Sequence, residues 1–114
     1  MKKVFRSLNN ALNGLKIVLL EERNFQIHIV LGVATIIIGM ALEISQVEMM
    51  FVVVAIVFVI ASEVINTAIE DLCDIVGPNP DSLIGKIKDI SSGFVLISAL
   101  GAIVIGIMVF LPHL

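Results

Sequence analysis

The chain has 114 residues, of which 59% are hydrophobic and only 15% are charged. Soluble domains have about 45 to 50% apolar residues, so this composition excludes an ordinary soluble domain and indicates a membrane protein. The formal net charge of -3 and the absence of Trp and Tyr argue against a nucleic-acid partner. The sequence also lacks a GxxxxGK[ST] loop and a GxGxxG turn, so no familiar nucleotide-binding fold is indicated.

Residues 3–21 predict a helix with two unlike faces. At 100° per residue, one face carries the apolar residues Val4, Phe5, Leu8, Leu12, Leu15 and Leu19. The other face carries Lys3, Arg6, Asn10 and Asn13. This pattern is typical of an amphipathic helix that lies on a membrane surface. A helix packed on the rest of the protein has the same pattern, and the two arrangements are compatible.

Three longer apolar segments follow, at about residues 25–43, 47–72 and 88–111. About 20 apolar residues are enough for a helix to cross a bilayer, so each segment predicts a membrane span. The link between the second and third spans contains the turn-forming residues Gly77, Pro78, Asn79, Pro80 and Gly85. We therefore expect an all-α membrane protein with three transmembrane helices and an N-terminal amphipathic surface helix, in a single domain over residues 1–114.

The basic residues predict how the spans are oriented. All seven either precede the first span or lie between the second and third: Lys2, Lys3, Arg6, Lys16, Arg23, Lys86 and Lys88. The link around residues 43–48 contains none. Since positive charges remain on the cytoplasmic side, we expect the amino terminus and the second link to be cytoplasmic.

Polar residues form one stripe on the second predicted span. On a helical wheel Asn66, Thr67, Glu70 and Asp74 all lie within 60° of Glu63. A charged side chain near the bilayer centre costs about 2.5 to 3.5 kcal/mol. A helix end that emerges into water accounts for Asp74, but poorly for Glu63, which is the deepest of these residues. The stripe therefore predicts a functional site.

Two further polar groups are expected at the same membrane level. One comprises Lys88, Asp89, Ser91 and Ser92, and the other comprises residues 21–25, which include Glu22. Carboxylates together with lysine suit a site for a divalent cation and phosphate. A proton or ion pathway uses similar residues. In an inert assembly protein the stripe would only fix the helix register. For Lys88 the alternative is that its side chain simply extends to the membrane interface without binding a ligand.

Two motifs on the second and third spans carry a family resemblance. They are residues 63–70, with the sequence EVINTAIE, and residues 85–89, with the sequence GKIKD. Together with Gly14, Leu15, Glu22 and Phe25, they resemble the small bacterial membrane diacylglycerol kinases. The segment 21–28, EERNFQIH, is more similar to the branch that includes undecaprenol kinases. The resemblance implies three spans and a surface helix, a homotrimer with active sites between subunits, and a place in the bacterial inner membrane.

The resemblance also implies roles for individual residues. Glu63 falls on the catalytic base, which also contacts the lipid together with Asn66 and Ser92. Glu22 and Glu70 fall on the carboxylates that bind Mg²⁺, and Lys88 with Asp89 on the nucleotide-binding pair. The other positions that match ATP-contacting segments are Lys3, where the diacylglycerol branch has arginine, Asn10, where the family has an aromatic residue, and Asn79, Pro80 and Asp81.

These residues predict a kinase that transfers the γ-phosphate of MgATP to a lipid alcohol, undecaprenol first and diacylglycerol second. The expected partners are ATP, the lipid, the membrane and further copies of the chain, without nucleic acid. A proton-coupled carrier or channel subunit and a non-catalytic assembly protein are the alternatives, although three spans argue weakly for a transporter. Formation of a phosphorylated lipid would distinguish the kinase from both.

Overall fold

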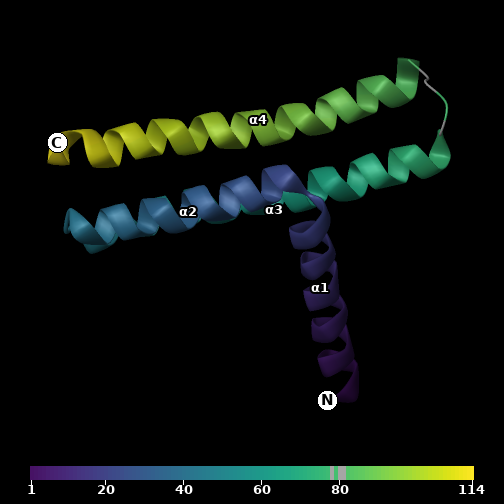
Figure 1. Cartoon of the computed structure of the whole chain (residues 1–114), viewed down its shortest axis with the longest axis horizontal. Helices are drawn as coiled ribbons and strands as arrows, with labels where there is room; N and C mark the ends of the chain where they lie inside the picture. Colours follow the sequence, from purple (N-terminus) through teal and green to yellow (C-terminus); the bar gives the residue numbers. More distant parts are fainter. Residues whose placement is uncertain (78, 80–81) are drawn as a thin grey trace.

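The computed structural model describes residues 1–77, 79 and 82–114, and the secondary structure of these residues is entirely helical (Figure 1). The elements are α1 (Lys2–Glu21), α2 (Arg23–Ala41), α3 (Gln46–Val76), α4 (Ser82–Phe110) and a short 3₁₀ turn, η1 (Leu111–His113). Three helices, beginning at Arg23, Gln46 and Ser82, are long and apolar enough to cross a membrane. The predicted all-α fold with three candidate spans is confirmed.

A sharp corner separates α1 from α2. Glu22 interrupts the helix with an extended backbone (φ -105°, ψ 110°). The side chain of Gln26, one turn into α2, donates a hydrogen bond of 2.8 Å to the carbonyl of Leu19, which lies near the end of α1. This bond satisfies one of the carbonyls that a helix end leaves unpaired. It links the two helices at the corner, from which α1 projects crosswise to the others (Figure 1).

A tight connection joins α2 to α3. The amide of Ile44 donates to the carbonyl of Gly39 and the amide of Glu43 donates to that of Met40, which is the Schellman pattern of helix termination. Glu43 has the positive φ of 54° that this motif requires. Ser45 and Glu48 then form a reciprocal capping box at the start of α3. The turn is therefore well specified by local hydrogen bonds.

The central helix is α3, because both α2 and α4 pack on it. Its buried residues recur mostly every three or four positions: Val52, Ala55, Val59, Ser62, Glu63, Thr67 and Cys73. Between α3 and α4, the rings of Phe58 and Phe94 meet edge to face, with their centroids 5.9 Å apart. Much of the remaining apolar surface is exposed. Within one chain, only 17%, 28% and 11% of the apolar stretches of α2, α3 and α4 are buried. Lipid or other protein must cover that surface.

The helices of the α3–α4 hairpin are longer than the predicted spans. The helix α3 continues to Val76, and α4 already begins at Ser82 rather than near residue 88. The prediction that Gly85 belongs to the turn was wrong, because Gly85 lies inside α4, where a helical glycine is tolerated at a modest cost. With 31 residues, α3 is about 46 Å long, whereas a bilayer core is about 30 Å thick. One end of the hairpin therefore has the length to extend beyond the hydrocarbon.

Candidate active site

Glu63 lies where α3 is covered by the beginning of α2. Its side chain is only 6% exposed, and its Oε1 atom lies 3.2 Å from Nε2 of His28 on α2. The hydroxyl of Thr67, one turn further along α3, donates to the backbone carbonyl of Glu63 and not to its carboxylate. A carboxylate with so little access to water is costly unless other groups stabilise its charge. Its position in the core confirms that Glu63 is not a solvated helix end.

A chain of hydrogen bonds continues from α4 along the polar stripe of α3. The hydroxyl of Ser91 donates to Oδ1 of Asn66 at 2.7 Å, and Nδ2 of Asn66 donates to a carboxylate oxygen of Glu70 at 3.2 Å. Because both ends of the Asn66 amide are used, its orientation is fixed. The three residues connect α3 to α4 at the level where the stripe becomes more polar.

Lys88 lies near the start of α4, further than Ser91 toward the end of α3. Its ammonium group pairs with the carboxylate of Asp74 on α3, and the side chains of Lys88 and Asp74 are 37% and 64% exposed. An exposed ion pair of this kind contributes only about 0.2 to 1 kcal/mol. The pairing therefore holds Lys88 close to Asp74, but only weakly.

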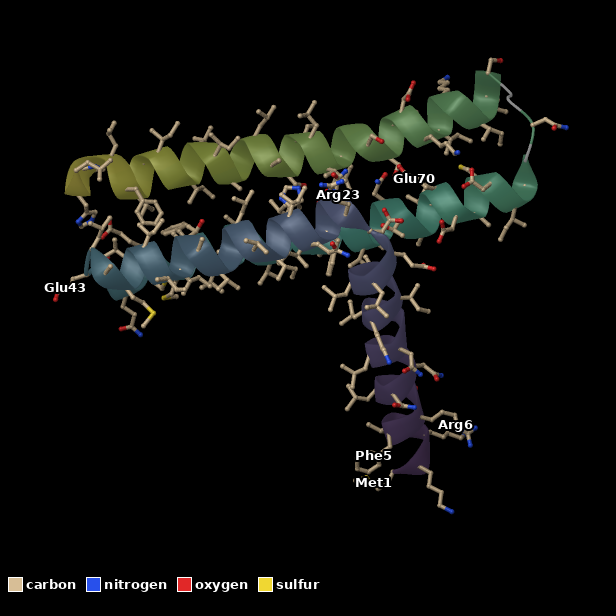
Figure 2. The ribbon with its side chains drawn as sticks, viewed as in Figure 1. Met1, Phe5, Arg6, Arg23, Glu43 and Glu70 are labelled. Carbon is tan, nitrogen blue, oxygen red and sulfur yellow. The ribbon has the colours of Figure 1, made fainter. Side chains whose placement is uncertain are left out.

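The corner between α1 and α2 contributes a further carboxylate. Glu22 is half-buried, and both Glu22 and Glu70 interact electrostatically with Glu63. Figure 2 shows Arg23 and Glu70 at a similar position along the long axis, away from Glu43 at the other end of the spans. Within the described ranges, no three His, Cys, Asp or Glu side chains come together closely enough to hold a metal ion. Two carboxylates suit Mg²⁺, which usually takes its remaining ligands from phosphate and water.

The other predicted site residues are not gathered into this cluster within one chain. Lys3 and Asn10 are exposed on α1, roughly 28 and 18 Å along the helix from the corner at Glu22. Asp89 and Ser92 are exposed on α4, and Asn79 is exposed between the helices. Pro80 and Asp81 lie outside the described residues. On α4 it is Ser91, rather than Ser92, that contacts the polar stripe.

A groove of about 560 Å³ runs between α2 and α4 over the surface of α3. Its lining is apolar except for His28 near one end and Thr35, whose hydroxyl donates to the carbonyl of Leu31. His28 thus contacts both this groove and Glu63. His28 was not among the site residues predicted from the sequence. The available signal was that His28 shares a helix face with Gly32 and Gly39, although this alone does not show which residue of α3 His28 meets.

A comparison with known protein families matches nearly the whole chain. The family model of prokaryotic diacylglycerol kinase matches residues 9–110, a range that contains Glu22, Glu63, Glu70 and Lys88. The chain belongs to this family. Members are lipid kinases, so the protein is a lipid kinase, as predicted. This result favours an enzyme over the ion-carrier and inert-assembly alternatives.

Two similar proteins are kinases of different lipids. The chain is 32% identical to an undecaprenol kinase from Bacillus subtilis over 114 residues, covering all of this chain and 93% of that protein. It is 31% identical to a diacylglycerol kinase from Synechocystis over 109 residues, covering 95% of this chain and 62% of that protein. Together with the three apolar helices, these relatives indicate a multi-pass bacterial membrane protein that acts on a lipid.

Proposed function

We propose that this kinase transfers the γ-phosphate of ATP to the hydroxyl of a membrane lipid alcohol, undecaprenol in preference to diacylglycerol. The observation that carries the proposal is the nearly buried carboxylate of Glu63, which lies on the same helix face as the hydrogen-bonded residues Asn66 and Glu70. The undecaprenol kinase of Bacillus subtilis matches all 114 residues of this chain, which supports undecaprenol as the preferred lipid.

In this proposal the two ends of the polar stripe have different roles, with the lipid at Glu63 and the nucleotide near Glu70. The lipid oxygen attacks the γ-phosphorus while Glu63 accepts the hydroxyl proton. A new phosphorus–oxygen bond to the lipid forms as the bond to the β-phosphate oxygen breaks, and ADP leaves. Glu70 lies roughly 10 Å along α3 from Glu63, so the lipid and the nucleotide approach from opposite ends of the stripe.

Glu22 and Glu70 would hold Mg²⁺, which when bound neutralises charge on the phosphate oxygens. Lys88 and Asp89 would bind the nucleotide, together with Asn79, Pro80 and Asp81 of the link. Lys88 is already held near the carboxylates by Asp74. We expect Glu22→Gln and Glu70→Gln each to raise the Mg²⁺ concentration needed for half-maximal rate. An unchanged requirement in both variants would place the metal elsewhere.

In this proposal α1 lies on the membrane surface. Phe5 and Arg6 point to opposite sides of α1, and Phe5 points toward the side on which the spans extend to Glu43 (Figure 2). A helix placed along the interface would thus turn an apolar face to lipid and Arg6 to water. The positive-inside rule would place the amino terminus in the cytoplasm and the protein in the inner membrane. The ends of α3 and α4 near Asp74 and Lys88 would then reach the cytoplasmic ATP.

The proposed assembly is a homotrimer. Lys3 and Asn10 are far from Glu63 along α1 of their own chain, so in this proposal they contact nucleotide or lipid in a site shared with a neighbouring copy. The large exposed apolar surface of the spans also leaves room for contacts between copies. Mass measurement in mild detergent should find three chains. A fully active monomer would exclude a shared site.

The lipid preference is tested by competition. Purified protein in vesicles receives undecaprenol and diacylglycerol at equal mole fraction with labelled ATP and Mg²⁺, and the two phosphorylated lipids are separated and counted. We expect undecaprenyl phosphate to be the main product. Phosphatidic acid as the main product would reverse the order of substrates, and the absence of both products would remove the proposed reaction.

A further inference from the structure

His28 and Glu63 face each other across the contact between α2 and α3. Nε2 of His28 lies 3.2 Å from Oε1 of Glu63, and the two side chains are 26% and 6% exposed. His28 lies on the side of α2 that carries the buried residues Phe25, Gly32 and Gly39, at spacings of three, four and seven residues. Its direction is therefore set by the packing of α2 on α3.

Among the described residues, His28 is the only side chain that makes a polar contact with the Glu63 carboxylate. The negative charges near Glu63 are Glu22, at the corner between α1 and α2, and Glu70, on the same helix as Glu63, and both oppose a further negative charge. On α4, the hydroxyl of Ser91 donates to Asn66 instead. A carboxylate oxygen only accepts hydrogen bonds, so Nε2 stabilises it when that nitrogen carries a hydrogen.

The contact uses one oxygen of the carboxylate. The described residues contain no fully buried side-chain nitrogen or oxygen that lacks a hydrogen bond, and Oε2 of Glu63 makes no hydrogen bond among them. Oε2 therefore keeps some accessible surface. His28 also lines the groove between α2 and α4, so the imidazole contacts apolar surface open to lipid on one side and the carboxylate on the other.

We infer that His28 is a positioning residue for Glu63: its Nε2–H holds Oε1 and leaves Oε2 free to accept the proton of the lipid hydroxyl. The inference rests on the proposed function of Glu63 as the base. Proton transfer requires the carboxylate to stay within hydrogen-bond reach of the hydroxyl. A displacement of about 1 Å in such a group costs up to about a hundredfold in rate.

The kinetic test compares three variants of the full chain in vesicles. His28→Leu removes the nitrogen and should lower kcat by about tenfold to a hundredfold, with the KM for MgATP changed less than about twofold. His28→Gln keeps an N–H at similar reach and should recover most of that loss. Thr35→Val is the matched control, because it removes the other polar group of the groove, which is bonded only to its own helix. Wild-type kcat in His28→Leu, or equal losses in Leu and Gln, would overturn the inference.

A second measurement does not depend on activity. The chain has two histidines, so ¹⁵N NMR of the labelled imidazoles can follow His28 while His113 serves as an internal reference. Glu63→Leu should shift the Nε2 signal of His28 and leave that of His113 in place, and Glu63→Gln gives the same comparison with the side-chain shape kept. An unmoved His28 signal in both variants would overturn the contact. Normal turnover of Glu63→Gln would instead remove the proposed base itself, and the inference with it.

Discussion

The hydroxyl of Ser91 on α4 donates a hydrogen bond of 2.7 Å to the side-chain oxygen of Asn66 on α3. This bond determines which end of the Asn66 amide faces Glu70, because the oxygen is turned to Ser91 and the nitrogen then donates to the Glu70 carboxylate. A polar residue of α4 thereby orients a group next to a proposed metal ligand.

Ser91→Ala should therefore weaken both stability and catalysis. Removing the hydroxyl leaves Oδ1 of half-buried Asn66 without its partner, and an unsatisfied buried group costs about 1 to 3 kcal/mol at most. We expect a lower free energy of unfolding in detergent and a several-fold slower turnover. Ser98→Ala is the control, since Ser98 is also buried on α4 but donates only to the carbonyl of Phe94 in its own helix. Equal effects of the two variants would contradict a specific role for the Ser91–Asn66 bond.

Substitutions of Lys88 and of Asp74 should change the KM for ATP in opposite directions. If Lys88 binds phosphate, Lys88→Met should raise the KM for ATP. Asp74→Asn should lower that KM by at most about fivefold, because it frees Lys88 from an exposed ion pair worth about 0.2 to 1 kcal/mol. The measurement is the ATP dependence of the rate at saturating Mg²⁺ and lipid. A raised KM in Asp74→Asn would show that Asp74 itself contributes to nucleotide or metal binding.

Close packing of α2 on α3 predicts an unequal response to two Gly→Ala substitutions. A Cβ at Gly32 would lie 2.8 Å from Cγ2 of Ile56, whereas a Cβ at Gly101 meets no atom within 4 Å. Gly32→Ala should lower the free energy of unfolding by about 1 to 3 kcal/mol through overpacking. Gly101→Ala should change it by no more than about 1 kcal/mol. Unfolding in mixed micelles compares the two, and a fully stable Gly32→Ala protein would show that Ile56 moves aside freely.

The sequence was a good guide to the spans and to the stripe on α3. Apolar segments long enough for a bilayer are recognisable without tertiary contacts, and a helical wheel places Glu63, Asn66 and Glu70 on one side of any helix. The extent of the hairpin helices was less predictable. Gly85 is compatible with both a turn and a helix, and only the start of α4 at Ser82 decides between them.

Contacts between helices could not be predicted in the same way. The pairing of His28 with Glu63 depends on the register of α2 against α3, and nothing in the segment around His28 fixes that register. Likewise, Ser91 and Ser92 are both on the polar side of α4 in a wheel, but only Ser91 is buried against Asn66. Lys3 and Asn10 were placed in the site by resemblance alone, and their distance along α1 makes their role depend on the proposed assembly.

The turnover of Glu63→Gln tests the central claim most directly. The substitution keeps the shape of the side chain and removes the base, so the proposed trimer should persist and MgATP should still bind. A general base typically contributes about 10² to 10⁴ in rate, so transfer to the lipid should fall by at least about a hundredfold. Rates are measured in vesicles with saturating ATP and lipid, alongside ATP binding to the same preparation. Near-normal turnover of Glu63→Gln would contradict the assignment of Glu63 as the group that accepts the lipid proton.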